Sequence, residues 1–258
     1  MSLNTLIAFQ VGSQAKPSEY LDRYVSDMFF WYEGNYGLTQ TSWKEASGNG
    51  VDLSRFDAGE VNFIDTLNSL NVCEIRAGSA AGWQYTNPDY SQTVMTNGYT
   101  YTILVNIGTL GGSPVATDLL QFGNLNHCLY SDVSVGTRPT FYRNSTGNGF
   151  IQYTGYTEGD WLLLTLYGTG VNDLNMYANG NTGTLASTTS SGSTLDTSSP
   201  TFVHNSINTE QLKIAEMIAF NNNIGLTKRE ETEGYLAHKW GVTSLLPGGH
   251  PYKSSAPS

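Results

Sequence analysis

The chain is poor in charge. Only 13% of its 258 residues are charged, and 22 acidic residues against 12 basic ones give a net charge of −10. The few Lys and Arg residues form no basic cluster. Proteins that bind nucleic acids neutralise phosphate groups with such clusters. The composition therefore predicts a protein that does not bind nucleic acid.

Cysteine is scarce as well. Cys73 and Cys128 are the only two, and no spacing of metal ligands surrounds either of them. Two thiols can form one disulfide but not the framework of several disulfides that holds small secreted domains together. We expect two buried free thiols, with a single Cys73–Cys128 disulfide as the alternative.

Targeting signals and long apolar runs are also missing. The first residues, MSLNTLIAFQVGSQ, lack the charged start and the apolar core of a secretory signal. No apolar run reaches the length that spans a bilayer. We expect no signal peptide and no membrane insertion. If the protein acts outside the cell that makes it, it leaves by assembly into a particle or by lysis.

Catalytic motifs are absent too. The chain contains no G-x-S-x-G, P-loop or H-E-x-x-H motif, and its four histidines are scattered. No strand carries the closely spaced carboxylates that a retaining glycosidase needs. An enzyme would require distant acids such as Glu74 and Glu216 to converge in a cleft. We therefore predict that the protein is not an enzyme.

Candidate metal ligands are few. Calcium sites in loops use carboxylate and carbonyl oxygens, and the candidates here are Asp118, Asp132 and Asp173. None of these residues belongs to a dense run of Asp and Asn. We expect no cofactor and no metal, with a calcium ion in these loops as the alternative.

Glycine and tyrosine are abundant, with 28 and 16 residues. Together with Asn, Ser and Thr, they are typical of short strands joined by turns. A chain of this length can form one large all-β domain. We assign residues 1–28 to an N-terminal arm or docking segment and residues 29–258 to the domain. Apolar and alternating runs predict strands at 29–32, 98–107, 119–122, 127–130, 140–142, 150–153, 160–167, 174–180 and 214–220.

A helix is predicted near the C-terminus, after a turn of three asparagines. Thr227 and Glu230 have the spacing of a capping box that would start it. Gly241 is placed to end it in a left-handed conformation. Gly234 in the middle of the helix costs roughly 1 kcal/mol relative to alanine. We expect close packing of its backbone against a strand or an aromatic ring to compensate.

Two segments carry a resemblance to a known family. Residues 214–241 read IAEMIAFNNNIGLTKREETEGYLAHKWG and are followed by the tail LPGGHPYK at 246–253; upstream, 43–53 reads WKEASGNGVDL. These segments resemble the concanavalin A-like, or laminin-G-like, jelly-roll family. That family is common in tailed-phage structural proteins and in bacterial surface proteins. The chain departs from its usual pattern at Glu45, where Asp is common.

The resemblance implies an all-β fold, a two-sheet antiparallel jelly-roll sandwich with a short C-terminal helix. It covers about residues 29–253, and the strands at 161–167 and 174–180 match the two central strands of one sheet. Glu216 matches the glutamate that is usual in the last strand of the family. A structural role, in which it pairs with or caps a neighbouring segment, is what the resemblance implies for this residue.

The resemblance also suggests a function. It implies a virion structural protein of a tailed bacteriophage, such as a head decoration, a fibre or a tail component, located in the virion. The expected partners are other virion proteins of the capsid or tail, copies of the same chain in a homo-oligomer, and a host surface polysaccharide. The alternative is a carbohydrate-binding adhesin module of a bacterial surface protein.

One loop combines aromatic and polar side chains. Sugars bind to aromatic faces through their C–H surfaces and to polar side chains through their hydroxyls, and exposed Tyr and Trp are also common in protein interfaces. We predict that this loop contacts a glycan or a protein partner, with packing of its rings onto the sandwich as the alternative. The predicted contact residues are Trp83, Tyr85, Asn87, Asp89 and Tyr90.

Overall fold

The structure is a computed structural model. It describes residues 21, 23–55, 63–75, 81–85, 98–108, 117–122, 127–131, 139–143, 149–169, 173–182, 185–187, 201–205 and 212–258. The strands are β1 Met28–Glu33, β2 Ser42–Trp43, β3 Leu53–Arg55, β4 Phe63–Leu67, β5 Leu70–Ile75, β6 Ala81–Tyr85, β7 Tyr99–Ile107, β8 Thr117–Phe122, β9 His127–Ser131, β10 Pro139–Arg143, β11 Gly149–Tyr153, β12 Trp161–Gly168, β13 Asn175–Ala178, β14 Leu185–Ser187, β15 Thr201–Asn205 and β16 Leu212–Phe220. The helical segments are η1 Val25–Asp27, α2 Gly225–Lys239 and η2 Thr243–Leu245.

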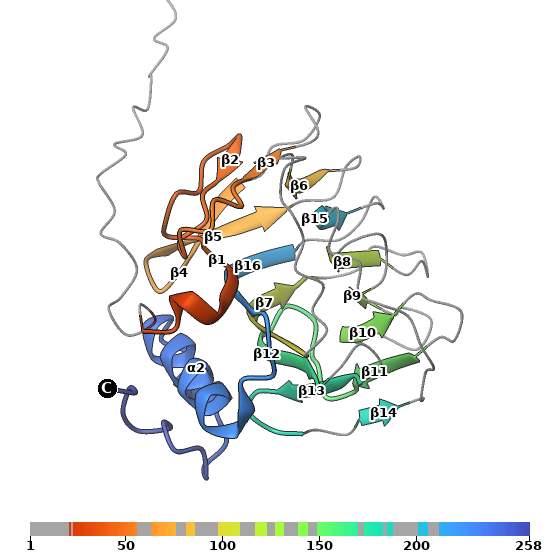
Figure 1. Cartoon of the computed structure of the whole chain (residues 1–258), viewed down its shortest axis with the longest axis vertical. Helices are drawn as coiled ribbons and strands as arrows, with labels where there is room; N and C mark the ends of the chain where they lie inside the picture. Colours follow the sequence, from red (N-terminus) through yellow and green to blue (C-terminus); the bar gives the residue numbers. More distant parts are fainter. Residues whose placement is uncertain are drawn as a thin grey trace, which may run out of the picture.

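The strands form antiparallel sheets. A seven-stranded sheet has the order β13-β12-β7-β16-β5-β4, with β1 paired to β16. A five-stranded sheet, β14-β11-β10-β9-β8, and a four-stranded sheet, β15-β6-β3-β2, make up the rest, and β15 lies beside β8 (Figure 1). The predicted all-β sandwich with a C-terminal helix is confirmed. Its second layer consists of the two smaller sheets.

Strand β7 shows why this sheet is buried on both faces. Tyr101 and Ile103 belong to the core between the layers, together with Phe141 of the five-stranded sheet and Trp43 of the four-stranded one. Leu104, which follows Ile103 and points to the opposite face, belongs to a second buried cluster on the outer face. A strand that is covered on both sides reads as a nearly continuous apolar run, which is the pattern of this segment.

Helix α2 covers that outer face (Figure 1). It starts at Gly225, two residues before Thr227, so the predicted capping box is wrong. The Asn223 side chain accepts a hydrogen bond from the Gly225 amide at 3.0 Å and caps the helix in its place. The predicted end is confirmed, because Gly241 has φ +65° and Val242 donates back to Ala237 at 2.8 Å.

The tail after the helix packs back onto it. A Cβ atom placed on Gly234 would lie 2.5 Å from Cβ of Tyr252, so only glycine fits under this ring. Nε2 of His238 hydrogen-bonds to the carbonyl oxygen of Tyr252 at 2.9 Å. The expected close packing of the Gly234 backbone is confirmed, and the aromatic ring that packs against it is that of Tyr252 in the C-terminal tail.

The turn at 45–50 is part of the scaffold. Glu45 accepts hydrogen bonds from the amides of Trp31, Ser47, Gly48 and Asn49. Gly48 and two residues later Gly50 have positive φ. Glu45 lies where the family that this segment resembles commonly has Asp, and it serves as the acceptor that closes a tight turn.

Little of the predicted N-terminal arm lies in the described part of the chain. Leu21 is buried in the outer cluster. Beyond it, Tyr24 donates a hydrogen bond to Glu231, and Asp27 forms an ion pair with Lys228 at 2.6 Å. Leu21 and residues 23–27 therefore pack on α2, whereas residues 1–20 and 22 lie outside the described residues. Within the described residues, no helix is long and apolar enough to cross a membrane.

Glu216 anchors the helix to the sheet. Its carboxylate accepts hydrogen bonds from Nε1 of Trp31, Nε1 of Trp240 and Nζ of Lys239, each at 2.7 Å. Lys239 also lies 2.8 Å from a carboxylate oxygen of Glu33. The structural role expected for Glu216 is confirmed.

Glu33 and Glu216 share the single Lys239 ammonium, so the negative charge of one of the two carboxylates is not compensated. Burial, followed by the neighbouring Glu216 charge, raises the pKa of Glu33 from 4.5 to about 7, although Lys239 opposes the shift. The folded protein therefore binds a proton on Glu33 in the range where the unfolded chain has lost it. The stability that this proton contributes is present below about pH 4.5 and is lost as the pH rises to about 7.

We predict that Glu33→Gln flattens this pH dependence. Glutamine does not titrate, so the free energy of unfolding of the variant should fall less than that of the wild type between about pH 4.5 and about pH 7. Urea unfolding at several pH values measures both slopes. The same replacement at the exposed Glu158 is the control. Equal slopes in the wild type and Glu33→Gln would contradict the raised pKa of Glu33.

Candidate functional site

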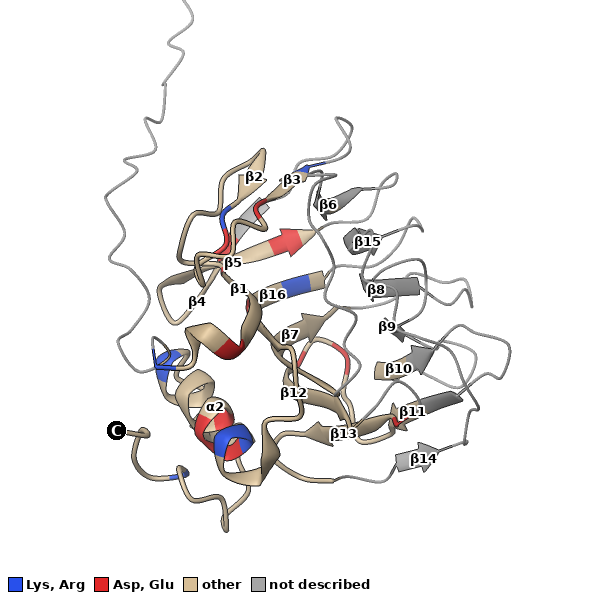
Figure 2. Cartoon of the chain, viewed as in Figure 1, with Lys and Arg blue, Asp and Glu red and all other residues tan. Residues whose placement is uncertain are grey.

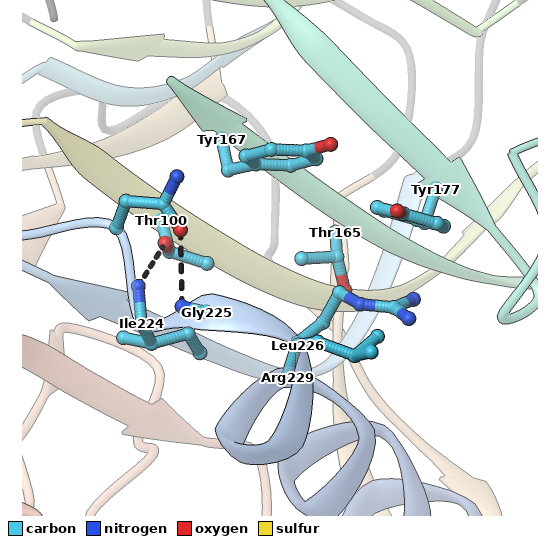
Figure 3. Close-up of a pocket in the computed structure, with 9 residues that line it drawn as sticks. Thr100, Thr165, Tyr167, Tyr177, Ile224, Gly225, Leu226 and Arg229 are labelled. Carbon is cyan, nitrogen blue, oxygen red and sulfur yellow. Dashed lines mark hydrogen bonds between the residues drawn. The ribbon is translucent and has the colours of Figure 1, made fainter. Parts of the chain in front are cut away.

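A pocket of about 190 Å³ lies between the start of α2 and the outer face of the seven-stranded sheet. We call it the Tyr pocket (Figure 3). Strands β7, β12 and β13 form one side, and the turn before α2 and its first residues form the other. Its lining residues are Thr100, Thr165, Tyr167, Tyr177, Asn223, Ile224, Gly225, Leu226 and Arg229.

Two tyrosine rings form the wall on the strand side. Tyr167 stands two residues after Thr165 on β12, and Thr165 is paired with Tyr177 of β13, so the two rings are diagonal neighbours on one face. Their centroids are 5.5 Å apart with an interplanar angle of 20°. Burial, and then a hydrogen bond with Tyr177 that favours the protonated hydroxyl, raises the pKa of Tyr167 to about 12. Its hydroxyl therefore stays protonated at neutral pH.

A buried carboxylate positions two residues of the pocket. Glu233, with 1% of its surface exposed, accepts from Thr165 Oγ1 at 2.8 Å and from Nη1 of Arg229 at 3.1 Å. Nε2 of His250 lies 3.3 Å from its other oxygen. The Arg229 guanidinium also lies over the Tyr177 ring at 3.6 Å, which holds it against the pocket wall.

The turn before α2 forms the remaining side. Thr100 Oγ1 donates to the carbonyl oxygen of Asn222 at 3.0 Å and accepts from the Ile224 amide at 3.3 Å. Figure 3 shows this second bond and the cap on Gly225. Leu226 is 61% exposed and is the one large apolar side chain exposed among the described residues. It adds an exposed apolar surface to the lining of the pocket.

The predicted contact loop lies elsewhere. Trp83 on β6 is fully buried, packs edge-to-face on Trp43 at 6.3 Å and donates Nε1 to Sγ of Cys73 at 3.2 Å. Its ring is therefore part of the core, which is the packing role given above as the alternative. Tyr85 ends β6, but its side chain lies outside the described residues. Asn87, Asp89 and Tyr90 also lie outside them, so contact through these four residues stays a prediction.

Cys73 is a free buried thiol, as expected. Burial raises its pKa to about 12, so it remains a neutral thiol that accepts from Trp83. Cys128 belongs to β9, and its side chain lies outside the described residues.

The structure describes some of the residues that were considered above as metal ligands or as catalytic acids. Both oxygens of Asp173 bond within its own loop, to Thr169 and Asn175. The side chain of Asp118 and the whole of Asp132 lie outside the described residues. Within the part of the chain that the structure describes, no three His, Cys, Asp or Glu residues gather as a metal site would require. Glu216 shares its Lys239 partner with Glu33, rather than being paired with Glu74.

Sequence reasoning did not identify the Tyr pocket. It predicted a fully buried strand at 160–167 and a hairpin strand closed by an Asn-Gly turn at 174–180. The turn is confirmed, with positive φ at both Asn179 and Gly180. The available signal was the alternation of Thr165 and Tyr167 with leucines. The pocket forms because α2 lies over that face of the sheet, and the alternation does not predict where the helix lies.

No known protein-family profile matches the chain, and no curated protein matches it. Solved structures do match. One is of botulinum neurotoxin type C, whose cell entry is described as dependent upon interaction with two ganglioside molecules. It has a TM-score of 0.61 and 12% identity over 88% of this chain and 53% of that one. Another is the binding domain of Paraclostridial Mosquitocidal Protein 1, with a TM-score of 0.62 and 12% identity over 81% and 52%.

A third similar structure is the botulinum neurotoxin DC binding domain in complex with rat synaptotagmin II. It has a TM-score of 0.60 and 11% identity over 86% of this chain and 52% of that one. The chain thus spans about half the length of these neighbours. At such identities the likeness shows a shared fold. The neighbours are described as binding domains, and none of these descriptions names a catalytic activity.

We predict that Trp83→Ala destabilises the domain rather than removing one contact residue. Truncating a fully buried tryptophan creates a cavity and costs roughly 3–5 kcal/mol. Urea unfolding of the variant and the wild type measures this loss. Leu226→Ser, at an exposed position, should change the stability by only about 0.5 kcal/mol. A Trp83→Ala variant as stable as the wild type would show that this ring does not carry the core.

Proposed function

We propose that the chain is a carbohydrate-binding domain without catalytic activity, and that the Tyr pocket holds one sugar ring. The observation that carries this proposal is the combination of a stacked tyrosine pair and an exposed leucine with hydroxyl and guanidinium groups in one small pocket. A sugar ring has both an apolar C–H surface and hydroxyls. A mixed lining of this kind can satisfy both.

The dimensions of the pocket support a small ligand. Its volume of about 190 Å³ is below the range of roughly 300–1,000 Å³ of sites for drug-sized molecules. Tyr167 and Leu226 supply the apolar contacts. The hydroxyl oxygens of Thr100 and Tyr167 can accept hydrogen bonds and the Arg229 guanidinium can donate them, so both kinds of partner exist for the hydroxyls of a single ring.

The charges favour a neutral sugar. Arg229 is the only Lys or Arg in the lining, and it already pairs with Glu233 at 3.1 Å and lies 3.6 Å from Glu230. Acidic and basic residues follow one another along the ribbon of α2 (Figure 2). Because the local cation is compensated and the chain carries a net charge of −10, nothing would attract an anionic ligand over distance.

The fold neighbours support binding in general. Among them, one neurotoxin ligand-binding domain is in complex with N-acetylneuraminic acid, and the cell entry of another neurotoxin is described as dependent upon interaction with two ganglioside molecules. Those ligands belong to those proteins. The present chain matches about half of each, so a ligand of the whole neighbour can be held by the other half.

We predict that Leu226→Ser and Tyr167→Ala each weaken binding of a neutral glycan at least fivefold, which corresponds to roughly 1 kcal/mol of lost apolar contact. A panel of bacterial surface polysaccharides, measured by calorimetry, identifies the glycan first. The control is Tyr36→Ala, which removes a half-buried tyrosine outside the pocket. Added salt should change the affinity little.

Two results would contradict this assignment. If Leu226→Ser and Tyr36→Ala bind the glycan equally well, the sugar is held elsewhere. If reducing ends accumulate during long incubation with the polysaccharide, the protein cleaves it and is an enzyme.

The setting is the second part of the proposal. We propose that the domain belongs to the virion of a tailed bacteriophage, where it assembles with capsid or tail proteins as a homo-oligomer. The support is the resemblance of residues 43–53 and 214–253 to the jelly-roll family of phage structural proteins. An adhesin module of a bacterial surface protein is the alternative that the same resemblance supports.

Mass spectrometry distinguishes these settings. We expect peptides of this chain in stoichiometric amounts in purified particles, because a structural component is present in a fixed copy number. Their absence from particles, with recovery from washed bacterial envelopes, would favour the adhesin.

A further inference from the structure

A second pocket, of about 380 Å³, opens near the start of β12. We call it the Trp161 pocket. Among its lining residues are the aromatic Trp161 and Tyr153 and the polar Asp160, Asn179 and Ser244. Trp161 and Tyr167 lie six residues apart on one strand, which places the two pockets about 20 Å apart at opposite ends of β12.

Trp161 differs from the other tryptophans. All five lie in the described part of the chain. Four are fully buried, and their indole N–H groups donate to Glu216, to the Glu33 carbonyl or to Cys73. Trp161 is half-buried and its indole has no such partner among the described residues. Its ring is therefore the one tryptophan surface that a ligand can reach.

The polar side chains of this pocket are held in position, and each keeps a group that is available to a ligand. Asn179 accepts from the Leu163 amide at 2.9 Å through Oδ1, which fixes the side chain and leaves its Nδ2 to the pocket. The Asp160 carboxylate is exposed and has no hydrogen-bond or ion-pair partner among the described residues. Tyr156 lies in the same turn, and its hydroxyl donates a hydrogen bond to the Ile107 carbonyl oxygen at 2.6 Å. This bond anchors the turn that carries Asp160 to β7.

The charge of this pocket is negative. No Lys, Arg or His lines it, and Glu158 lies in the same turn as Asp160. The nearby Lys253 ammonium is engaged with the carbonyl oxygens of Thr243 and Leu246 at 2.8 and 2.6 Å. An unpaired carboxylate next to two aromatic rings attracts a cation, through a charge-assisted hydrogen bond and through the ring faces.

We propose that the Trp161 pocket is a second binding site, selective for a sugar ring that carries a protonated amine. Asp160 accepts from the ammonium group, the ring lies on Trp161 or Tyr153, and Asn179 and Ser244 contact its hydroxyls. This site does not depend on sugar binding in the Tyr pocket, because the two share no lining residue.

The test uses D-glucosamine as the probe and N-acetylglucosamine as the same ring without the charge. At about pH 6 the amine is protonated. In a two-dimensional NMR titration of the full chain we expect glucosamine to shift the Trp161 indole signal, assigned with Trp161→Phe. The four buried indoles should shift little. N-acetylglucosamine should bind at least about tenfold more weakly, because it cannot form the charge-assisted bond.

Asp160→Asn is the decisive variant. We expect it to weaken glucosamine at least about tenfold, since it keeps the shape but removes the charge. Glu158→Gln is the matched control, because it removes a charge from the same turn without touching the pocket lining; it should change the affinity little. Tyr167→Ala should leave the Trp161 response intact, which separates this site from the Tyr pocket.

Three results would overturn the proposal. Equal binding of the two probes would remove the selectivity for an amine. Unchanged affinity in Asp160→Asn, or a loss as large in Glu158→Gln, would remove the role of this carboxylate. A titration that leaves the Trp161 signal unmoved would show that no such ligand enters the pocket.

Discussion

The Glu216 carboxylate and its three donors hold the architecture together. Two indole N–H groups and one ammonium converge on it from β1 and from α2 and the residue after it. A fully buried carboxylate is tolerated only where such partners replace its water. Because the donors come from segments far apart in the sequence, this one charge sets where the helix lies on the outer face of the sheet.

The positions of both pockets follow from that placement. The first turn of α2 reaches the tyrosines of β12 and β13, and the 3₁₀ segment η2 after the helix reaches the other end of β12. Glu233 links the helix to the same strand through Thr165 and orients Arg229. The sites are thus formed where a rigid helix meets a rigid sheet, which holds ligand-contacting groups more firmly than a free loop can.

The two pockets differ chemically because their charged residues, Arg229 and Asp160, make different contacts. Arg229 is paired with acids and stacked on Tyr177, so its charge is compensated. Asp160 lacks such a partner among the described residues. One strand therefore carries a compensated pocket at one end and an acidic one at the other.

The sequence alone determined the fold class and the positions of many of the strands. Alternation and apolar runs identify β7, β12 and β16, and Gly241 marks the end of α2, because local periodicity and backbone conformation depend on near neighbours. Only the tertiary structure decided which aromatic residues are accessible. Trp83 and Trp161 stand in similar strand contexts, but one is sealed against Trp43 and Cys73, whereas the other remains at a pocket. That difference depends on which distant segments cover each ring, and no local pattern carries this information.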